Sequence, residues 1–407
     1  MPVPEQTVAR RRVFYIPGYD PIHPRRYREL YRTESAAQAA VSGYEISLSA
    51  RQGGARYGWD VAATMEGAQV ASQLDVLVWS DIVRDSMDTS IIATYGQLLR
   101  TAWVYIGSGA LWRLMRLRKG PVIAALYPVG MLLGQLLLCV AVGMGLLRLG
   151  QAVVDGAAGH VLGAVAGGGA FVWLMRWFKA KDAKFFAYYL MHDYAFGAAT
   201  RGANTPALEA RMAEFGAAIA EALDSDVDEV LVVGHSSGAH LGVSVLADLI
   251  RAGRVPADGP ALGFLTLGQV VPMVSFLRDA QRLRGDLAYL SASPALAWVD
   301  VTAPGDGCAF ALCDPVAVSG VAPRDKRWPL VFSAAFTQTL SPARWKELRW
   351  RFFRLHFQYM CAFDRPRDYD YFRITAGPLT LAARYRDRPP SKSRLTKAVN
   401  KFTDVVP

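Results

Sequence analysis

Three observations predict an α/β fold with a mostly parallel central sheet for this chain. The first is a run of four β-prone apolar residues at 230–233, which suits a buried strand. The second is the apolar spacing of residues 238–253, which is that of a helix following this strand directly. The third is the continued alternation of helix or loop with strand-like runs at 262–267, 296–302 and 330–333. Such alternation is typical of a parallel sheet covered on both faces.

The N-terminal part predicts the remaining strands. Residues 13–16 form a short strand-like run that is followed by a basic helical stretch at about 25–40. Residues 44–48 and 56–64 are separated by the turn-prone Gln52, Gly53 and Gly54, and this pattern favours a β-hairpin. A further strand is expected at 75–79.

Two long apolar segments account for the positive mean hydropathy of +0.16. The first, residues 121–147, is interrupted only by Gln135 and exceeds the ~20 residues that a helix needs to cross a bilayer. The second, residues 157–175, is rich in glycine and has His160 as its one ionisable side chain. We therefore expect a transmembrane helical hairpin at 118–181, inserted into one α/β domain formed by 1–117 and 182–388, with a basic tail at 389–407. A pair of buried core helices is the alternative.

The charge pattern predicts the orientation of this hairpin. Lysines and arginines flank its outer ends, at 113, 116, 118 and 119 before the first span and at 176, 179, 181 and 184 after the second. The positive-inside rule then places the α/β domain and both termini in the cytoplasm. Much of the net charge of +10 lies beside the spans and in the tail, where an anionic membrane surface would attract it. The expected partner is therefore the lipid bilayer, and no nucleic acid is implied.

The motif Gly234-His235-Ser236-Ser237-Gly238 lies at the break between the strand at 230–233 and the following helix. A turn this tight admits no Cβ where neighbouring backbone approaches, which explains Gly234 and Gly238. On this motif the chain resembles the α/β-hydrolase superfamily, as an esterase-like or lipase-like, membrane-anchored member of bacterial type. The resemblance implies an α/β-hydrolase fold and makes Ser236 the catalytic nucleophile.

The resemblance also implies that nucleophile, acid and base follow one another along the chain. His356 is the only histidine after the candidate acids, so it is the expected base, although a structural role beside Phe352, Phe353 and Phe357 is the alternative. Asp306 follows the strand-like run 296–302 and is the expected acid, with Asp314 as the runner-up. The carboxylate would hold the imidazole tautomer and stabilise the imidazolium.

Acyl transfer needs hydrogen-bond donors for the oxyanion, and backbone amides supply them. The amide of Ser237 is one expected donor. Residues 14–19 resemble the family's H-G-x loop with Pro17 in place of histidine, which makes the amide of Tyr19 the second. No metal or organic cofactor is implied.

The expected function is that of a membrane-bound serine hydrolase acting on an ester or thioester, with a lipid substrate favoured by location. A catalytically silent scaffold or lipid-binding protein, and an acyltransferase using the same serine, are the alternatives. The transmembrane hairpin could also join copies of the chain in an oligomer.

Overall fold

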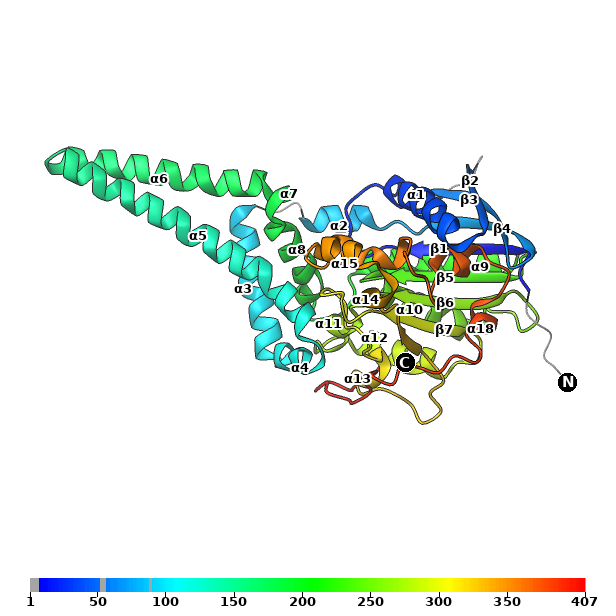
Figure 1. The fold of residues 1–407 in the computed structure, drawn as a ribbon. Helices are drawn as coiled ribbons and strands as arrows, with labels where there is room; N and C mark the ends of the chain where they lie inside the picture. Colours follow the sequence, from blue (N-terminus) through cyan, green and yellow to red (C-terminus); the bar gives the residue numbers. More distant parts are fainter. Residues whose placement is uncertain (1–6, 52–55, 88–89, 407) are drawn as a thin grey trace.

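A mixed β-sheet forms the centre of the protein (Figure 1). The computed structural model describes residues 7–51, 56–87 and 90–406. Within these residues the sheet has eight strands in the order β2-β3-β4-β1-β5-β6-β7-β8. The strands are β1 Arg10–Ile16, β2 Glu45–Ala50, β3 Gly58–Met65, β4 Ala68–Val76, β5 Glu229–His235, β6 Ala261–Leu267, β7 Ala297–Thr302 and β8 Leu330–Ser333.

The sheet is mostly parallel, which confirms the prediction of an α/β fold with a mostly parallel central sheet. The neighbouring strands from β4 through β1, β5, β6 and β7 to β8 pair in parallel, whereas β3 pairs antiparallel with β4 on one side and with β2 on the other, at one edge of the sheet. Residues 52–55, which contain the predicted turn of this hairpin, lie outside the described residues, as do residues 1–6 and 407 of the predicted domains. The strand expected at 75–79 lies earlier in the chain, as β4, and ends at Val76. Trp79 lies outside the sheet, where its ring nitrogen donates to the carbonyl of Pro17 (2.9 Å), and the next helix begins at Ser80.

Helices cover both faces of the sheet, so the central strands are apolar throughout. In β1, Val13 and Tyr15 pack into one core layer, while Phe14 and Ile16 pack into the other. α1 (Arg25–Ser42) and α17 (Tyr371–Ala376) cover the first face. α9 (Pro206–Leu223), α10 (Gly238–Arg251) and α12 (Gln281–Ala292) cover the second.

A further group of helices lies between the sheet and a projecting hairpin (Figure 1). These are α2 Ser80–Met87, α3 Ile91–Gly107, α4 Ala110–Leu117, α7 Asp182–Phe185 and α8 Ala187–Ala199. The remaining short helices are α11 Val271–Ser275, α13 Pro315–Val318, α14 Phe336–Thr339, α15 Pro342–Leu348, α16 Phe352–His356, η1 Gln358–Met360 and α18 Leu381–Arg384. The C-terminal tail packs on the body, where Leu395 donates its amide to Leu312 (2.7 Å) and Arg284 bonds Asp404.

The two apolar segments form the projecting hairpin, made of α5 (Lys119–Val153) and α6 (Gly156–Ala180). Glycines let the two helices approach closely: a Cβ on Gly163 would lie 2.5 Å from the carbonyl oxygen of Leu147. Both helices extend beyond the apolar segments expected at 121–147 and 157–175, and only two residues separate Val153 of α5 from Gly156 of α6.

Both helices are long and apolar enough to cross a membrane, by length and composition. Only 17% of the most apolar window of α5 and 22% of that of α6 is buried. A helix in the core of a soluble protein would be buried over most of its surface. The exposure of this pair therefore disfavours the core-helix alternative.

Candidate active site

Ser236 lies at the turn that joins β5 to α10, at the carboxyl end of the central strands. Its φ is 55°, a left-handed conformation that is uncommon for any residue except glycine. The Ser236 amide donates to the carbonyl of Leu267 at the end of β6 (2.9 Å), which fixes the turn against the sheet. Backbone strain of this kind is concentrated at functional sites. The turn leaves Ser236 half-buried on the wall of a cavity.

The two glycines of the motif stand where no side chain fits. A Cβ on Gly234 would lie 2.8 Å from the Cα of Ala239. A Cβ on Gly238 would lie 2.1 Å from the carbonyl oxygen of Ile16 and 2.7 Å from that of Pro17. The start of α10 therefore packs directly on the loop that follows β1.

We expect Gly238→Ala to destabilise the protein by about 3 kcal/mol, because backbone of both elements must shift to admit the methyl group. Denaturant unfolding of the purified protein in detergent measures this change. The matched control is Gly216→Ala in α9, where nothing lies within 4 Å of the added Cβ. This control should be neutral or stabilising by up to ~1 kcal/mol. Equal stabilities of the two variants would contradict the close packing at Gly238.

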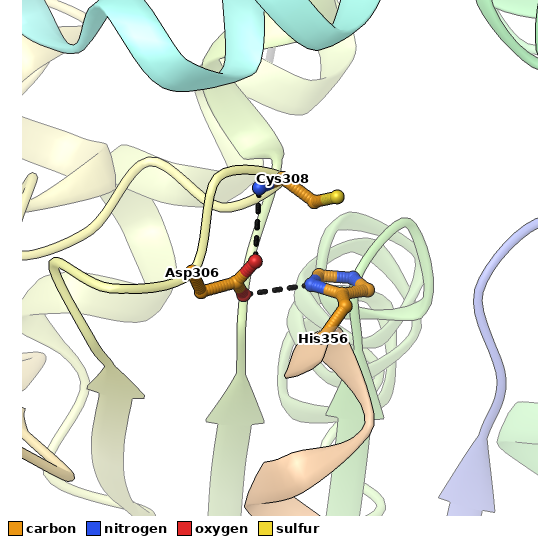
Figure 2. A group of neighbouring side chains, drawn as sticks. All are labelled: Asp306, Cys308 and His356. Carbon is orange, nitrogen blue, oxygen red and sulfur yellow. Dashed lines mark hydrogen bonds and ion pairs between the residues drawn. The ribbon is translucent and has the colours of Figure 1, made fainter. Parts of the chain in front are cut away.

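Asp306 and His356 form a buried pair beside this turn (Figure 2). Asp306 follows β7, and His356 is the last residue of α16. His356 Nδ1 lies 2.7 Å from Asp306 Oδ2. The same carboxylate accepts hydrogen bonds from the amide of Cys308 (2.9 Å) and from the hydroxyl of Tyr359 (3.0 Å). Every oxygen of this buried carboxylate therefore has a partner.

These contacts determine the protonation of the pair. Burial alone would raise the pKa of Asp306, but the charge of His356 and the hydrogen bonds from its neighbours outweigh burial and hold that pKa below its usual value. An ionised Asp306 accepts the hydrogen of Nδ1, which assigns the tautomer of His356 and leaves Nε2 as an acceptor. The pair thus has the arrangement of a base with its orienting acid.

His235, inside the motif, contacts His356 through a hydrogen bond and through ring packing. Its Nε2 lies 3.0 Å from the carbonyl oxygen of His356, and the two ring centroids are 4.7 Å apart. Burial, followed by the charge of His356, lowers the pKa of His235 to about 3, so this ring is neutral and donates to the carbonyl. Sequence reasoning missed this role, although the position of His235 next to Ser236 was a possible signal.

Ser236 and His356 line one cavity of about 550 Å³. No hydrogen bond joins the Ser236 hydroxyl to His356 among those of the described residues. Catalytic hydrogen bonds are often long in a ligand-free site and tighten when substrate binds. The structure thus brings the expected nucleophile and the expected base to the same cavity, without a hydrogen bond between them.

The runner-up acid, Asp314, has a different environment. Its Oδ1 accepts the amides of Val316 (3.1 Å) and Ala317 (3.0 Å) and caps α13, and its Oδ2 pairs with Lys326 (2.7 Å). Among the described residues, no hydrogen bond or ion pair joins Asp314 to His356. The structure therefore places Asp306, and not Asp314, beside the expected base.

The two expected oxyanion donors, Tyr19 and Ser237, also line the cavity. Within the described part of the chain, neither backbone amide donates to a protein acceptor, which is unusual for buried N–H groups. The loop of Tyr19 is held in place by the hydroxyl of Tyr189, which donates to the Tyr19 carbonyl (2.6 Å). A Cβ on Gly18 would lie 2.9 Å from the Cβ of Ser236, so this loop packs directly on the nucleophile turn.

Asp306, Cys308 and His356 are also the one group of described residues whose ligand atoms lie close enough together to hold a metal ion, within 4.8 Å of one another (Figure 2). Their chemistry does not fit this role. Nδ1 and Oδ2 are already paired with each other, and burial raises the pKa of the Cys308 thiol, which disfavours the thiolate that a metal requires. The donors fit a hydrogen-bonded pair better than a metal site.

Comparisons with known proteins find no match for this chain among family models, curated proteins or solved structures.

Sequence reasoning missed one further group, the carboxyl of Asp193 in α8, which lines the same cavity. Burial raises its pKa to about 7, against the opposing effect of the charge of His356. The available signal was a single acid within the apolar and aromatic helical stretch 186–199.

Proposed function

We propose that this protein is a membrane-attached serine hydrolase of the α/β-hydrolase type that cleaves an ester or a thioester. The observation that carries the proposal is that His356, hydrogen-bonded to the buried Asp306, lines the same cavity as Ser236, which lies at a strained turn. A serine alcohol is a poor nucleophile at neutral pH unless a base takes its proton. The two buried groups provide that base and its orienting acid.

The reaction follows from these positions. Ser236 Oγ attacks the carbonyl carbon while His356 Nε2 takes the hydroxyl proton. The amides of Tyr19 and Ser237 donate to the oxyanion of the tetrahedral intermediate, which is worth several kcal/mol in a water-poor site. When the intermediate collapses, His356 gives its proton to the departing alcohol or thiol. Water, deprotonated by His356, then hydrolyses the acyl-enzyme, and Asp306 stays ionised throughout.

A fluorophosphonate probe tests this proposal, because it forms a covalent bond only with an activated serine. We expect labelling of the native protein in its membrane, with the label on the peptide that contains Ser236. Absence of labelling at this residue would favour the second candidate, a lipid-binding protein without turnover. The open contact between Ser236 and His356 is the one observation that favours that candidate.

Attachment to a membrane is supported by α3 as well as by the hairpin. One face of α3 packs against α8, through Thr94, Leu98, Thr101 and Tyr105. The opposite face is apolar and exposed, with Ile92 at 85%, Leu99 at 70%, Trp103 at 79% and Ile106 at 52%. A helix that is apolar all round is expected in a core or in a membrane. The exposed face of α3 therefore requires an apolar surrounding.

The bilayer is the surrounding that fits the charge pattern. From residue 91 to residue 181 the only acidic side chain is Asp155, at the far tip of the hairpin, whereas arginines and lysines recur near its base. Figure 1 shows α3 and α4 at this base. We infer that the hairpin crosses the bilayer, that α3 lies in the headgroup region, and that the α/β body faces the cytoplasm.

The same placement supports a lipid substrate. Pro121 of α5 and Phe186 at the start of α8 line the cavity of Ser236, so the cavity reaches the base of the hairpin. An ester in the adjoining leaflet could therefore enter without crossing water.

Brominated lipids test the position of α3. In proteoliposomes, Trp103→Phe should remove a fluorescence component that brominated acyl chains quench and that aqueous iodide does not, because the indole contacts lipid. The control Trp59→Phe, at a side chain buried in the core, should remove a component that neither quencher reaches. Quenching of the Trp103 component by iodide would place α3 in water. Insensitivity to both quenchers would mean that protein, such as a second copy of the chain, covers this face.

A further inference from the structure

The carboxyl of Asp193 lies on the wall of the cavity without a protein partner. Among the hydrogen bonds and ion pairs of the described residues, none involves its oxygens. Asp20, the other acid of the cavity wall, differs, because it accepts the hydroxyl of Tyr27 (2.8 Å) and the amide of Ile22 (2.9 Å). Asp193 is therefore the acid of this cavity that remains available to a ligand.

The tyrosines around Asp193 do not satisfy it. Tyr105 and Tyr189 line the same cavity, and burial, followed by the charge of Asp193, raises the pKa of both phenols. Their hydroxyls donate elsewhere, that of Tyr105 to the carbonyl of Met273 (3.0 Å) and that of Tyr189 to the carbonyl of Tyr19 (2.6 Å). Asp193 is half-buried, so its unpaired carboxyl is open to the cavity. A polar group placed in this way among apolar lining residues is typical of a ligand contact.

Asp193 lies on the His356 side of the cavity, because Tyr189, one helical turn before it on α8, packs on Phe353 of α16, the helix that ends at His356 (ring centroids 6.0 Å apart). In the reaction proposed above, His356 gives a proton to the departing oxygen, so the alcohol part of the ester lies beside this histidine. A carboxyl on this side faces the alcohol part and not the remote end of the acyl chain.

We propose that Asp193 accepts a hydrogen bond from a second donor, a hydroxyl or a protonated amine, on the alcohol part of the substrate. The substrate class is then esters of polyols or of amino alcohols. This inference rests on the proposed function for the orientation of the ester, and it assigns Asp193 to recognition and not to the chemical step.

Binding to the Ser236→Ala protein tests this proposal without turnover. The probes are N-(2-hydroxyethyl)octanamide, N-(2-aminoethyl)octanamide and N-propyloctanamide, which share one acyl chain and differ in the terminal group. We expect the hydroxyethyl or the aminoethyl probe to bind about tenfold more tightly than the propyl probe, since the propyl group offers no hydrogen bond to the carboxyl. The arm that binds more tightly identifies the donor.

The second variant is Asp193→Leu in the same Ser236→Ala protein. It should remove the preference while the propyl probe binds as before. If the leucine variant does not fold, Asp193→Asn, which keeps the size of the side chain, takes its place. Asp193→Asn should weaken binding of the aminoethyl probe most. Equal binding of the three probes, no binding of any, or a preference that survives Asp193→Leu would overturn the proposal. Because no turnover is measured, a chain that fails fluorophosphonate labelling and still prefers a donor probe would lose only the proposed hydrolysis.

Discussion

Ser236→Ala is expected to lower kcat/KM for ester hydrolysis by about 10⁴- to 10⁶-fold and to abolish fluorophosphonate labelling. The alanine removes the only atom that bonds to the acyl group and leaves the turn intact. The positive φ of residue 236 is imposed by its neighbours, through the amide bond to Leu267 and the close contact of Gly238 with the β1 loop. The variant should therefore keep its unfolding midpoint.

The control is Ser49→Ala, at an exposed serine of the edge strand β2. It should hydrolyse p-nitrophenyl esters at the native rate in the same reconstituted preparation. Residual hydrolysis in the Ser236 variant within tenfold of the native rate would mean that another group is the nucleophile. Normal labelling of the Ser49 variant, together with loss of labelling at position 236, would separate the hydrolase from the lipid-binding candidate.

The parts of the fold that could be predicted are those in which local pattern and burial coincide. The run at 230–233 is apolar without interruption because β5 has core on both faces, and the break at Gly234 to Gly238 is required by backbone contacts of those two residues. The position of β1 between β4 and β5 could not be predicted, because the residues of a single strand do not indicate which distant strand it pairs with.

The residues of the candidate site were likewise predicted only in part. Chain order selected His356, and the position of Asp306 directly after a strand-like run favoured it over Asp314. The structure places Asp306 Oδ2 2.7 Å from His356 Nδ1. The hydroxyl of Tyr359 on that carboxylate and the carboxyl of Asp193 in the cavity were not foreseen. Both depend on long-range packing, since Asp193 comes from a helix that follows the hairpin and no motif accompanies it.

Asp306→Asn should lower kcat about 10⁴-fold with little change in KM. An asparagine at this position is nearly isosteric, but its amide group donates where the carboxylate accepted. His356 would then carry its hydrogen on Nε2, the atom that must take the proton of Ser236, and no anion would stabilise the imidazolium. The amide of Cys308 still finds an oxygen at position 306, so the loop after β7 should keep its structure.

The matched control is Asp314→Asn. This carboxylate is equally buried, but it caps α13 and pairs with Lys326. None of its hydrogen bonds among the described residues involves the imidazole of His356. An asparagine keeps the cap and loses the ion pair, so stability should fall while kcat stays within about threefold of native. If Asp314→Asn were the slower of the two enzymes, the orienting acid would be Asp314 in the active conformation, and the loop between β7 and α13 would have to rearrange on substrate binding. Equal, native-like rates of both variants would show that His356 needs no carboxylate. The buried contact between His356 and Asp306 would then have a structural role only. The pair contributes to the reaction by stabilising the imidazolium of His356, and native-like rates would mean that this stabilisation is not needed.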